Sequence, residues 1–428
     1  MLQNNSIAFY IKKLSGKTAK RIFIALIFRG AGLVSGFLMS LAVARTLPLE
    51  QVGLFFLSLT IITFLSAISS LGLNQSLLRF IGAAESDNNW EEVNSAYRFA
   101  MQFGGIFSVI CAVTLWLSAD WIAFLLEKPG VASSLRAIAP AIVGLTLFTL
   151  HAQALQALHE TLRSILILNI VTPFLASVLL LLIAKPYSSW VASLYALSTS
   201  FTLIFALGLW WKHSWAAWPN SFTQTLWHSC LPLWIVIIVN QIHIWGGVLV
   251  AGFYVSASDI ALLMVAQRIS ILVSFVLMVV NVVMAPRFAA LWHQKQNEKL
   301  VQQSKHSTRL TIALTLPFVI IIFIFAKNIL LVFGEEYNQA VILLRILITG
   351  QLVTALAGTV SNLLMMSGDE KSIRNITLIS GVVGLLLSLT LVSKYGVLGA
   401  ACSTAMVTAF QNIWVFLLVK RRLGFWNI

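Results

Sequence analysis

The chain has 428 residues, of which 59% are apolar and only 10% are charged, and its mean hydropathy is +0.91. An average soluble domain carries about a quarter charged residues, so this composition excludes a soluble globular enzyme and a disordered chain. Lys and Arg number 28 against 14 Asp and Glu. In a membrane protein this excess indicates topology first, because cytoplasmic loops collect basic residues.

Continuous apolar runs of about twenty residues are typical of transmembrane helices and are too long for the alternating strands of a barrel. The sequence predicts an all-α polytopic membrane protein with about twelve transmembrane helices. In chain order, the expected spans are residues 22–45, 52–74, 99–119, 135–157, 164–184, 190–211, 230–253, 260–285, 309–331, 340–366, 375–393 and 398–419. Two polar segments, 86–98 and 287–308, are candidates for interfacial helices.

The distribution of basic residues predicts the orientation. An even number of spans puts both chain ends on one side of the membrane. With both ends inside, most Lys and Arg residues fall on the cytoplasmic side, and few, such as Arg45, Lys128 and Lys394, fall outside. The sequence therefore predicts cytoplasmic termini. The cysteines lie in apolar runs without metal-ligand spacing, and no phosphate-binding loop is present, so neither metal nor cofactor is expected.

The two halves of the chain form a weak repeat. Val52-Gly53-Leu54 follows the first span of one half, and Ile260-Ala261-Leu262 follows the corresponding span of the other. Because each half has an even number of spans, the halves have the same orientation, which favours a parallel repeat about an axis along the membrane normal. We expect two six-helix lobes, residues 1–215 and 216–428, around a central cavity that opens by alternating access.

Three arginines lie inside expected spans: Arg29, Arg268 and Arg345. A central arginine costs about 2.5 to 3.5 kcal/mol on insertion and normally faces a bundle interior or a wet cavity. No Asp or Glu is expected within a span core to pair with them, and a guanidinium fork matches phosphate and carboxylate geometry. The pattern predicts a cationic cavity for an anionic substrate such as a pyrophosphate head group. The alternatives are an interhelix clamp for Arg268 and snorkelling for Arg29 and Arg345.

Four further polar residues are candidates for a hydrated path, for substrate contact or for proton coupling. They are His151, His243, Asn240 and Asn281. The alternative for each is an ordinary hydrogen bond between helices.

Several short motifs, taken in order, resemble those of polysaccharide flippases of the O-antigen type. They are Ala44-Arg45-Thr46-Leu47 with Gln51-Val52-Gly53-Leu54, Leu71-Gly72-Leu73 with Leu78-Arg79-Phe80, Ala266-Gln267-Arg268 with Ala285-Pro286-Arg287-Phe288, Phe333-Gly334-Glu335-Glu336-Tyr337 with Ala340, Ser367-Gly368-Asp369-Glu370-Lys371, and Tyr395-Gly396-Val397-Leu398-Gly399-Ala400. The resemblance covers nearly the whole chain and rests on the order and spacing of the motifs.

The resemblance implies the multidrug/oligosaccharidyl-lipid/polysaccharide (MOP) exporter superfamily, with two six-helix lobes and a V-shaped cavity. It implies transport of an undecaprenyl-diphosphate-linked oligosaccharide, such as an O-antigen repeat unit, across the inner membrane of a bacterium. Arginines in the first and eighth helices of related flippases contact the diphosphate, and Arg29 and Arg268 fall at similar places. Membrane lipids and a coupling ion, H⁺ or Na⁺, are further expected partners; nucleic acid and covalent catalysis are not expected.

Two other functions stay open. A cation-coupled multidrug exporter of the same superfamily would be expected to carry an intramembrane carboxylate. A membrane glycosyltransferase or polymerase would need a sizeable outer loop with catalytic residues. The fourteen spans of peptidoglycan-precursor flippases, against twelve here, argue against lipid II as the substrate.

Overall fold

The computed structural model describes residues 16–183, 185–210 and 223–425, and within those ranges every regular element is a helix. The elements of the first half are α2 (Gly16–Thr46), α3 (Leu49–Ser69), α4 (Leu73–Ser86), α5 (Trp90–Leu125), α6 (Gly130–Ile138), α7 (Ala141–Ala157), α8 (Thr161–Ile165), the π-helix η1 (Leu166–Val171), α9 (Thr172–Ile183) and α10 (Ser188–Trp210). The all-α fold class is confirmed.

The second half of the chain is also made of helices. Its elements are α11 (Thr223–Tyr254), α12 (Ala257–His293), α13 (Asn297–Ile324), α14 (Ala326–Leu331), the 3-10 helix η2 (Glu335–Ala340), α15 (Val341–Ala357), α16 (Val360–Met366) and α17 (Glu370–Leu423). Ten helices of the described residues are long and apolar enough to cross a membrane, and the pair α6–α7, bent by 41°, makes an eleventh.

The twelfth crossing lies within α17, because α17 is a hairpin of two helices and each helix crosses the membrane once. Gly396 has φ 56° and ψ −133°, a conformation that interrupts the helix and that suits glycine. Ser388 Oγ donates a hydrogen bond to Ser403 Oγ at 3.1 Å, and Gln411 Nε2 donates to Thr377 Oγ1 at 3.3 Å. Side chains this far apart in sequence meet only if the two arms are antiparallel. The expectation of about twelve spanning helices is confirmed.

The two interfacial helices expected at 86–98 and 287–308 are not separate elements. Residues 90–98 form the start of the long α5, and residues 287–308 belong to the adjoining ends of α12 and α13. Capping sets these boundaries: Asn89 accepts the backbone N–H of Glu92 and begins α5 well before the apolar run. Hydropathy locates the membrane-embedded stretch of a helix but does not locate its ends.

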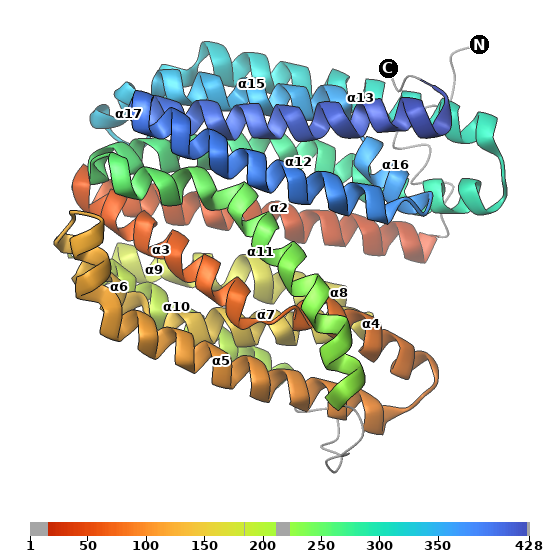
Figure 1. Ribbon diagram of the computed structural model, residues 1–428, viewed down its shortest axis with the longest axis horizontal. Helices are drawn as coiled ribbons and strands as arrows, with labels where there is room; N and C mark the ends of the chain where they lie inside the picture. Colours follow the sequence, from red (N-terminus) through yellow and green to blue (C-terminus); the bar gives the residue numbers. More distant parts are fainter. Residues whose placement is uncertain (1–15, 184, 211–222, 426–428) are drawn as a thin grey trace.

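The helices run roughly along the long axis of the molecule in two groups (Figure 1). In this view α3 to α10 form the lower group, α12 to α17 form the upper group, and α2 lies between them. The long α11 runs obliquely from α4 toward α17, and it packs against both. The start of α2 and the end of α17 lie at the same end of the molecule. The expected lobe boundary at 215–216 falls outside the described residues and stays a prediction.

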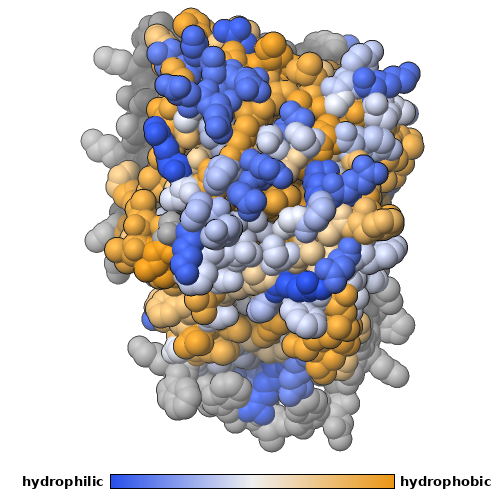
Figure 2. Space-filling view, turned by 90° about the vertical axis from the view of Figure 1, so that its left-hand side faces the viewer, coloured by the Kyte–Doolittle hydropathy of each residue, from blue (hydrophilic) through white to orange (hydrophobic). Residues whose placement is uncertain are grey.

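The opposite end, which we call the closed end, is where α3 of the lower group meets the start of α12 of the upper group, at Gly53 and Ala257. Lys128 Nζ donates to the carbonyl of Gly252 at 2.7 Å, and Arg45 Nε donates to the carbonyl of Val332 at 2.7 Å. Figure 2 shows this end face-on, with hydrophilic side chains gathered over it and hydrophobic ones beside them. Side chains that donate to backbone carbonyls therefore tie α11 to the lower group and α2 to the upper group at this end.

Candidate functional site

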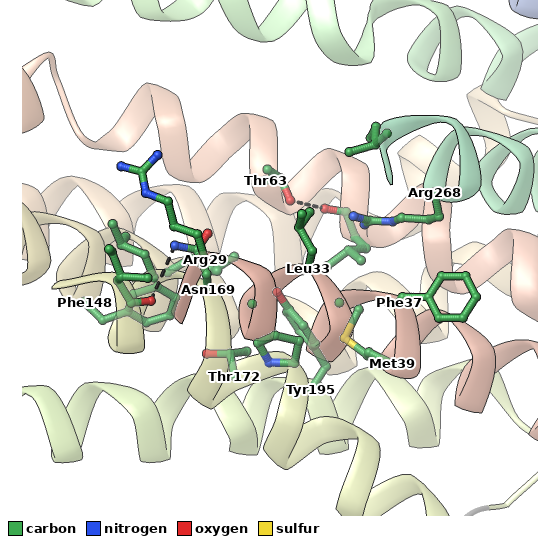
Figure 3. A pocket seen from close by; sticks show the side chains of 18 of the residues that line it. Arg29, Leu33, Phe37, Met39, Thr63, Phe148, Asn169, Thr172, Tyr195 and Arg268 are labelled. Carbon is green, nitrogen blue, oxygen red and sulfur yellow. Dashed lines mark hydrogen bonds between the residues drawn. The ribbon is translucent and has the colours of Figure 1, made fainter. Parts of the chain in front are cut away.

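A cavity of about 590 Å³ lies between the two groups of helices, and we call it the central cavity. Its walls come from α2, α3, α7 to α10, α11 and α12. Figure 3 shows it from close by, with Arg29 and Arg268 on opposite sides of the view and Thr63 and Leu33 between them.

Close contact between α2 and η1 shapes one wall of the central cavity. A Cβ at Gly32 would lie 2.6 Å from Cβ of Asn169, so only glycine lets α2 approach this closely. The π-helix η1, which carries Asn169, ends just before Pro173, a residue that cannot donate the next backbone hydrogen bond. Single π-turns of this kind are often found at functional sites. The arrangement brings Asn169 to the cavity beside Arg29 (Figure 3).

The central cavity is cationic. Arg29 on α2 and Arg268 on α12 line it, and its lining residues include no Asp or Glu. The Cζ atom of Arg268 lies 5.9 Å from the ring centroid of Trp245, within the range of a cation–π contact. The Nε atom of Arg268 is buried without a hydrogen-bond partner, and no salt bridge of the described residues involves either arginine. The site therefore presents donors and positive charge that the protein itself does not neutralise.

Two further hollows adjoin the central cavity. One, of about 390 Å³, shares Arg29 and Met278 with it, and we call it the side hollow. The other, of about 900 Å³, shares Thr63 and Leu145 with it, and we call it the amide hollow. Because they share lining residues with the central cavity, the three hollows form a series of neighbouring spaces.

Four of the seven residues singled out from the sequence line this series. Arg29 and Arg268 line the central cavity, Asn281 joins Arg29 in the side hollow, and Asn240 lines the amide hollow. Their contact with a substrate stays a prediction.

The other three lie elsewhere. Arg345 is exposed, and its Nε donates to the carbonyl of Phe323 at 3.4 Å while its guanidinium covers the Phe323 ring at 5.1 Å. His151 is fully buried within the first half, where its Nδ1 shares a 2.8 Å hydrogen bond with the Tyr97 hydroxyl. His243 on α11 is half-buried and is absent from the lining of the three hollows. The interhelix hydrogen bond left open for His151 is the arrangement observed.

Sequence reasoning missed several uncharged polar residues of the hollows. They include Gln156, Ser164 and Asn169 in the central cavity and Asn74 and Gln75 in the amide hollow. The only local signals were an Asn-Gln pair next to Gly72 and a second one at residues 240–241. Neither pair reveals that α4 and α11 face the same space.

Twelve crossings in two groups around a cavity define a multi-pass membrane protein built as a transporter. A family model described as polysaccharide biosynthesis protein matches residues 42–342. Since this match spans more than half of the sequence, the chain belongs to that family. The membership confirms the resemblance to polysaccharide flippases. A search of curated proteins finds no significant match.

Solved structures of MOP superfamily transporters share the fold. An inward-facing multidrug resistance MATE family transporter has a TM-score of 0.78 and 15% identity, covering 94% of this chain and 98% of its own. Lipid II flippase MurJ, in an inward closed conformation, has a TM-score of 0.75 and 14% identity, covering 93% and 87%. A MOP superfamily transporter from Pyrococcus furiosus, described as having a binding pocket of reverse polarity, has a TM-score of 0.66 and 16% identity, covering 97% and 96%. Identities this low show the fold alone.

Proposed function

We propose that this protein moves an undecaprenyl-diphosphate-linked oligosaccharide, a repeat unit of O-antigen or another surface polysaccharide, across a bacterial inner membrane. The observation that carries the proposal is the pair of arginines, Arg29 and Arg268, in a central cavity without acidic residues. The Nε atom of Arg268 is buried without a hydrogen-bond partner, which is costly, and an anionic ligand offsets that cost. A diphosphate offers several acceptor oxygens in the geometry that guanidinium groups bind best.

The rest of the molecule supports transport by alternating access. The closed end is held by Lys128, which donates to the carbonyl of Gly252 on α11, and by Arg45 on α2, which donates to the carbonyl of Val332 after α14. The TM-score is 0.78 against an inward-facing MATE transporter and 0.68 against an outward-facing one. We infer that the closed end faces the periplasm, that both termini are cytoplasmic, and that this conformation receives substrate from the inner leaflet. The prenyl tail stays in lipid, and an H⁺ or Na⁺ gradient drives the cycle.

A cation-coupled multidrug exporter is the second candidate, because MATE transporters share the fold. The central cavity favours an anion, since its two charged lining residues are both arginines. A cationic drug in this cavity would meet repulsion from both of them.

A depletion strain tests the proposal. Switching the gene off should cause a completed lipid-linked repeat unit to accumulate while surface polysaccharide disappears. Arg268→Ala should fail to restore surface polysaccharide, although the protein is present in the membrane. Arg345→Ala is the matched control, because it removes an arginine that lies outside the three hollows.

Three results would each have a definite meaning. Unchanged lipid-linked pools with a normal surface, in a strain without a second flippase gene, would overturn the proposal. Drug sensitivity on depletion with a normal surface would instead identify an exporter. Accumulation of an incomplete glycan would point to an enzyme that extends it.

A further inference from the structure

The amide hollow differs in chemistry from the central cavity. It is lined by α3, α4, α7, α11, the end of α16 and the start of α17, and amides and hydroxyls dominate its polar lining. Two amide pairs stand out: Asn74 with Gln75 on α4, and Asn240 with Gln241 on α11. Among the residues whose side chains the structure describes, its charged lining residues are confined to the first turns of α17, and none of its lining residues is aromatic.

The wall that carries Asn74 and Gln75 is fixed by the break between α3 and α4. Gly72 has φ 78°, and a Cβ there would lie 2.5 Å from the carbonyl oxygen of Cys230 on α11. Trp234 Nε1, also on α11, donates to the carbonyl of Ile68 at 2.8 Å. These contacts dock the break onto α11, so both amide pairs are carried by helices that are packed together.

One amide oxygen of this hollow has no partner within the protein. Asn74 Oδ1 is buried without a hydrogen-bond partner. The neighbouring hydroxyls differ, because Thr146 Oγ1 shares hydrogen bonds with Ser66 Oγ at 3.1 Å and with Ser69 Oγ at 2.7 Å. Each amide offers two donors and an acceptor, and a ligand rich in hydroxyl groups can pair with both kinds. An unpaired buried carbonyl oxygen is costly, so such a ligand gains by satisfying it.

The position of the amide hollow fits the connectivity of the proposed substrate. It shares Thr63 and Leu145 with the central cavity. A diphosphate at the arginines would therefore leave whatever is joined to it at the mouth of the amide hollow. In a lipid-linked oligosaccharide, the group joined to the diphosphate is the first sugar.

We propose that the amide hollow binds the uncharged sugar portion of the substrate through Asn74 and Asn240, while Arg29 and Arg268 hold the diphosphate. This assignment rests on the proposed function. The described lining residues offer hydrogen-bonding groups and no aromatic ring, so in this proposal they hold the sugars by hydrogen bonds without stacking, which suits a site that must also release its substrate.

Binding of two probes by the purified full-length protein in detergent tests whether the sugar and the diphosphate are bound by these separate groups of residues. One probe is undecaprenyl diphosphate without sugar. The other is the undecaprenyl-diphosphate-linked glycan fraction extracted from the depletion strain. The variants Asn74→Leu and Asn240→Leu keep the side-chain size but remove the amide. Asn338→Leu, at an exposed position in η2, is the control.

Each Asn variant of the hollow should weaken binding of the glycan fraction about tenfold, as expected for one lost hydrogen bond, and leave undecaprenyl diphosphate binding unchanged. The unchanged probe also shows that the variant is folded. Arg268→Ala should weaken both probes. Equal losses for both probes in the Asn variants, or no loss for either, would overturn the sugar assignment.

Two further outcomes are distinguishable from these. Arg268→Ala binding both probes normally would overturn the proposed function itself. A loss of glycan binding in Arg374→Ala, with none in the Asn variants, would overturn the assignment to uncharged sugars and point to an acidic glycan at the start of α17.

Discussion

Gly53 offers a direct test of the closed end. It lies on α3 against the first residue of α12, and a Cβ there would sit 1.7 Å from the carbonyl oxygen of Ala257. Ordinary van der Waals contact begins near 3.4 Å, so α3 and α12 must separate in Gly53→Ala. The obstacle is backbone, which cannot change rotamer. Overpacking of this kind costs about 1 to 3 kcal/mol, which lowers the population of the closed conformation by about fivefold to more than a hundredfold.

The expected result is a folded protein whose closed end is shifted open. Spin labels at the exposed Ser133 on α6 and Ser393 on α17 would report it as a longer distance, with transport of lipid-linked glycan reduced. The background needs alanine at the three cysteines, Cys111, Cys230 and Cys402. Gly208→Ala is the matched control, because a Cβ there meets nothing within 4 Å. Unchanged distances with normal transport in Gly53→Ala would refute the reasoning.

Three other outcomes are expected. Arg345→Ala should retain transport of lipid-linked glycan within about twofold, because this exposed side chain bonds only to the carbonyl of Phe323 among the described residues; a null phenotype would instead support the substrate contact predicted from the sequence. Burial at the closed end lowers the pKa of Lys128 below its ordinary value of 10.5, so the closed conformation favours the neutral amine. Raising the pH toward 10.5 should therefore favour closure, and the spin-label distances should lose this pH dependence in Lys128→Met. Gly399→Ala should lower the thermal unfolding temperature in detergent, because its Cβ would lie 2.0 Å from the carbonyl of Leu391 in the α17 hairpin; an unchanged temperature would contradict the antiparallel packing.

The crossings could be predicted from sequence because each has its own apolar run. The turn at Gly396 is a good example, since hydropathy separates spans 375–393 and 398–419 and the helix is interrupted between them at Gly396. Helix ends could not be predicted in this way. A cap such as Asn89 starts its helix in water, where hydropathy gives no signal.

Some residues of the candidate site could be predicted from the sequence, and others could not. Arg29 and Arg268 could be found because a charge in an apolar run is rare and costly. Arg345 satisfied the same criterion, but depth along a helix does not reveal which face a side chain occupies. Asn74 and Asn240 come to one hollow only through the docking of α4 on α11. That proximity is a property of tertiary packing, which a single sequence without an alignment does not encode in any local pattern.

The oblique path of α11 has a consequence for how the protein is made. Trp234 bonds to the first half of the chain through Ile68, whereas Val239, five residues later, packs against Gly381 of α17. As the chain emerges from the ribosome, α11 can dock on the earlier helices at once. Its other side stays uncovered until the final hairpin enters the membrane. The last segment to be synthesised therefore completes the packing of a helix from the middle of the chain, and a nascent chain that ends early exposes that helix to membrane quality control.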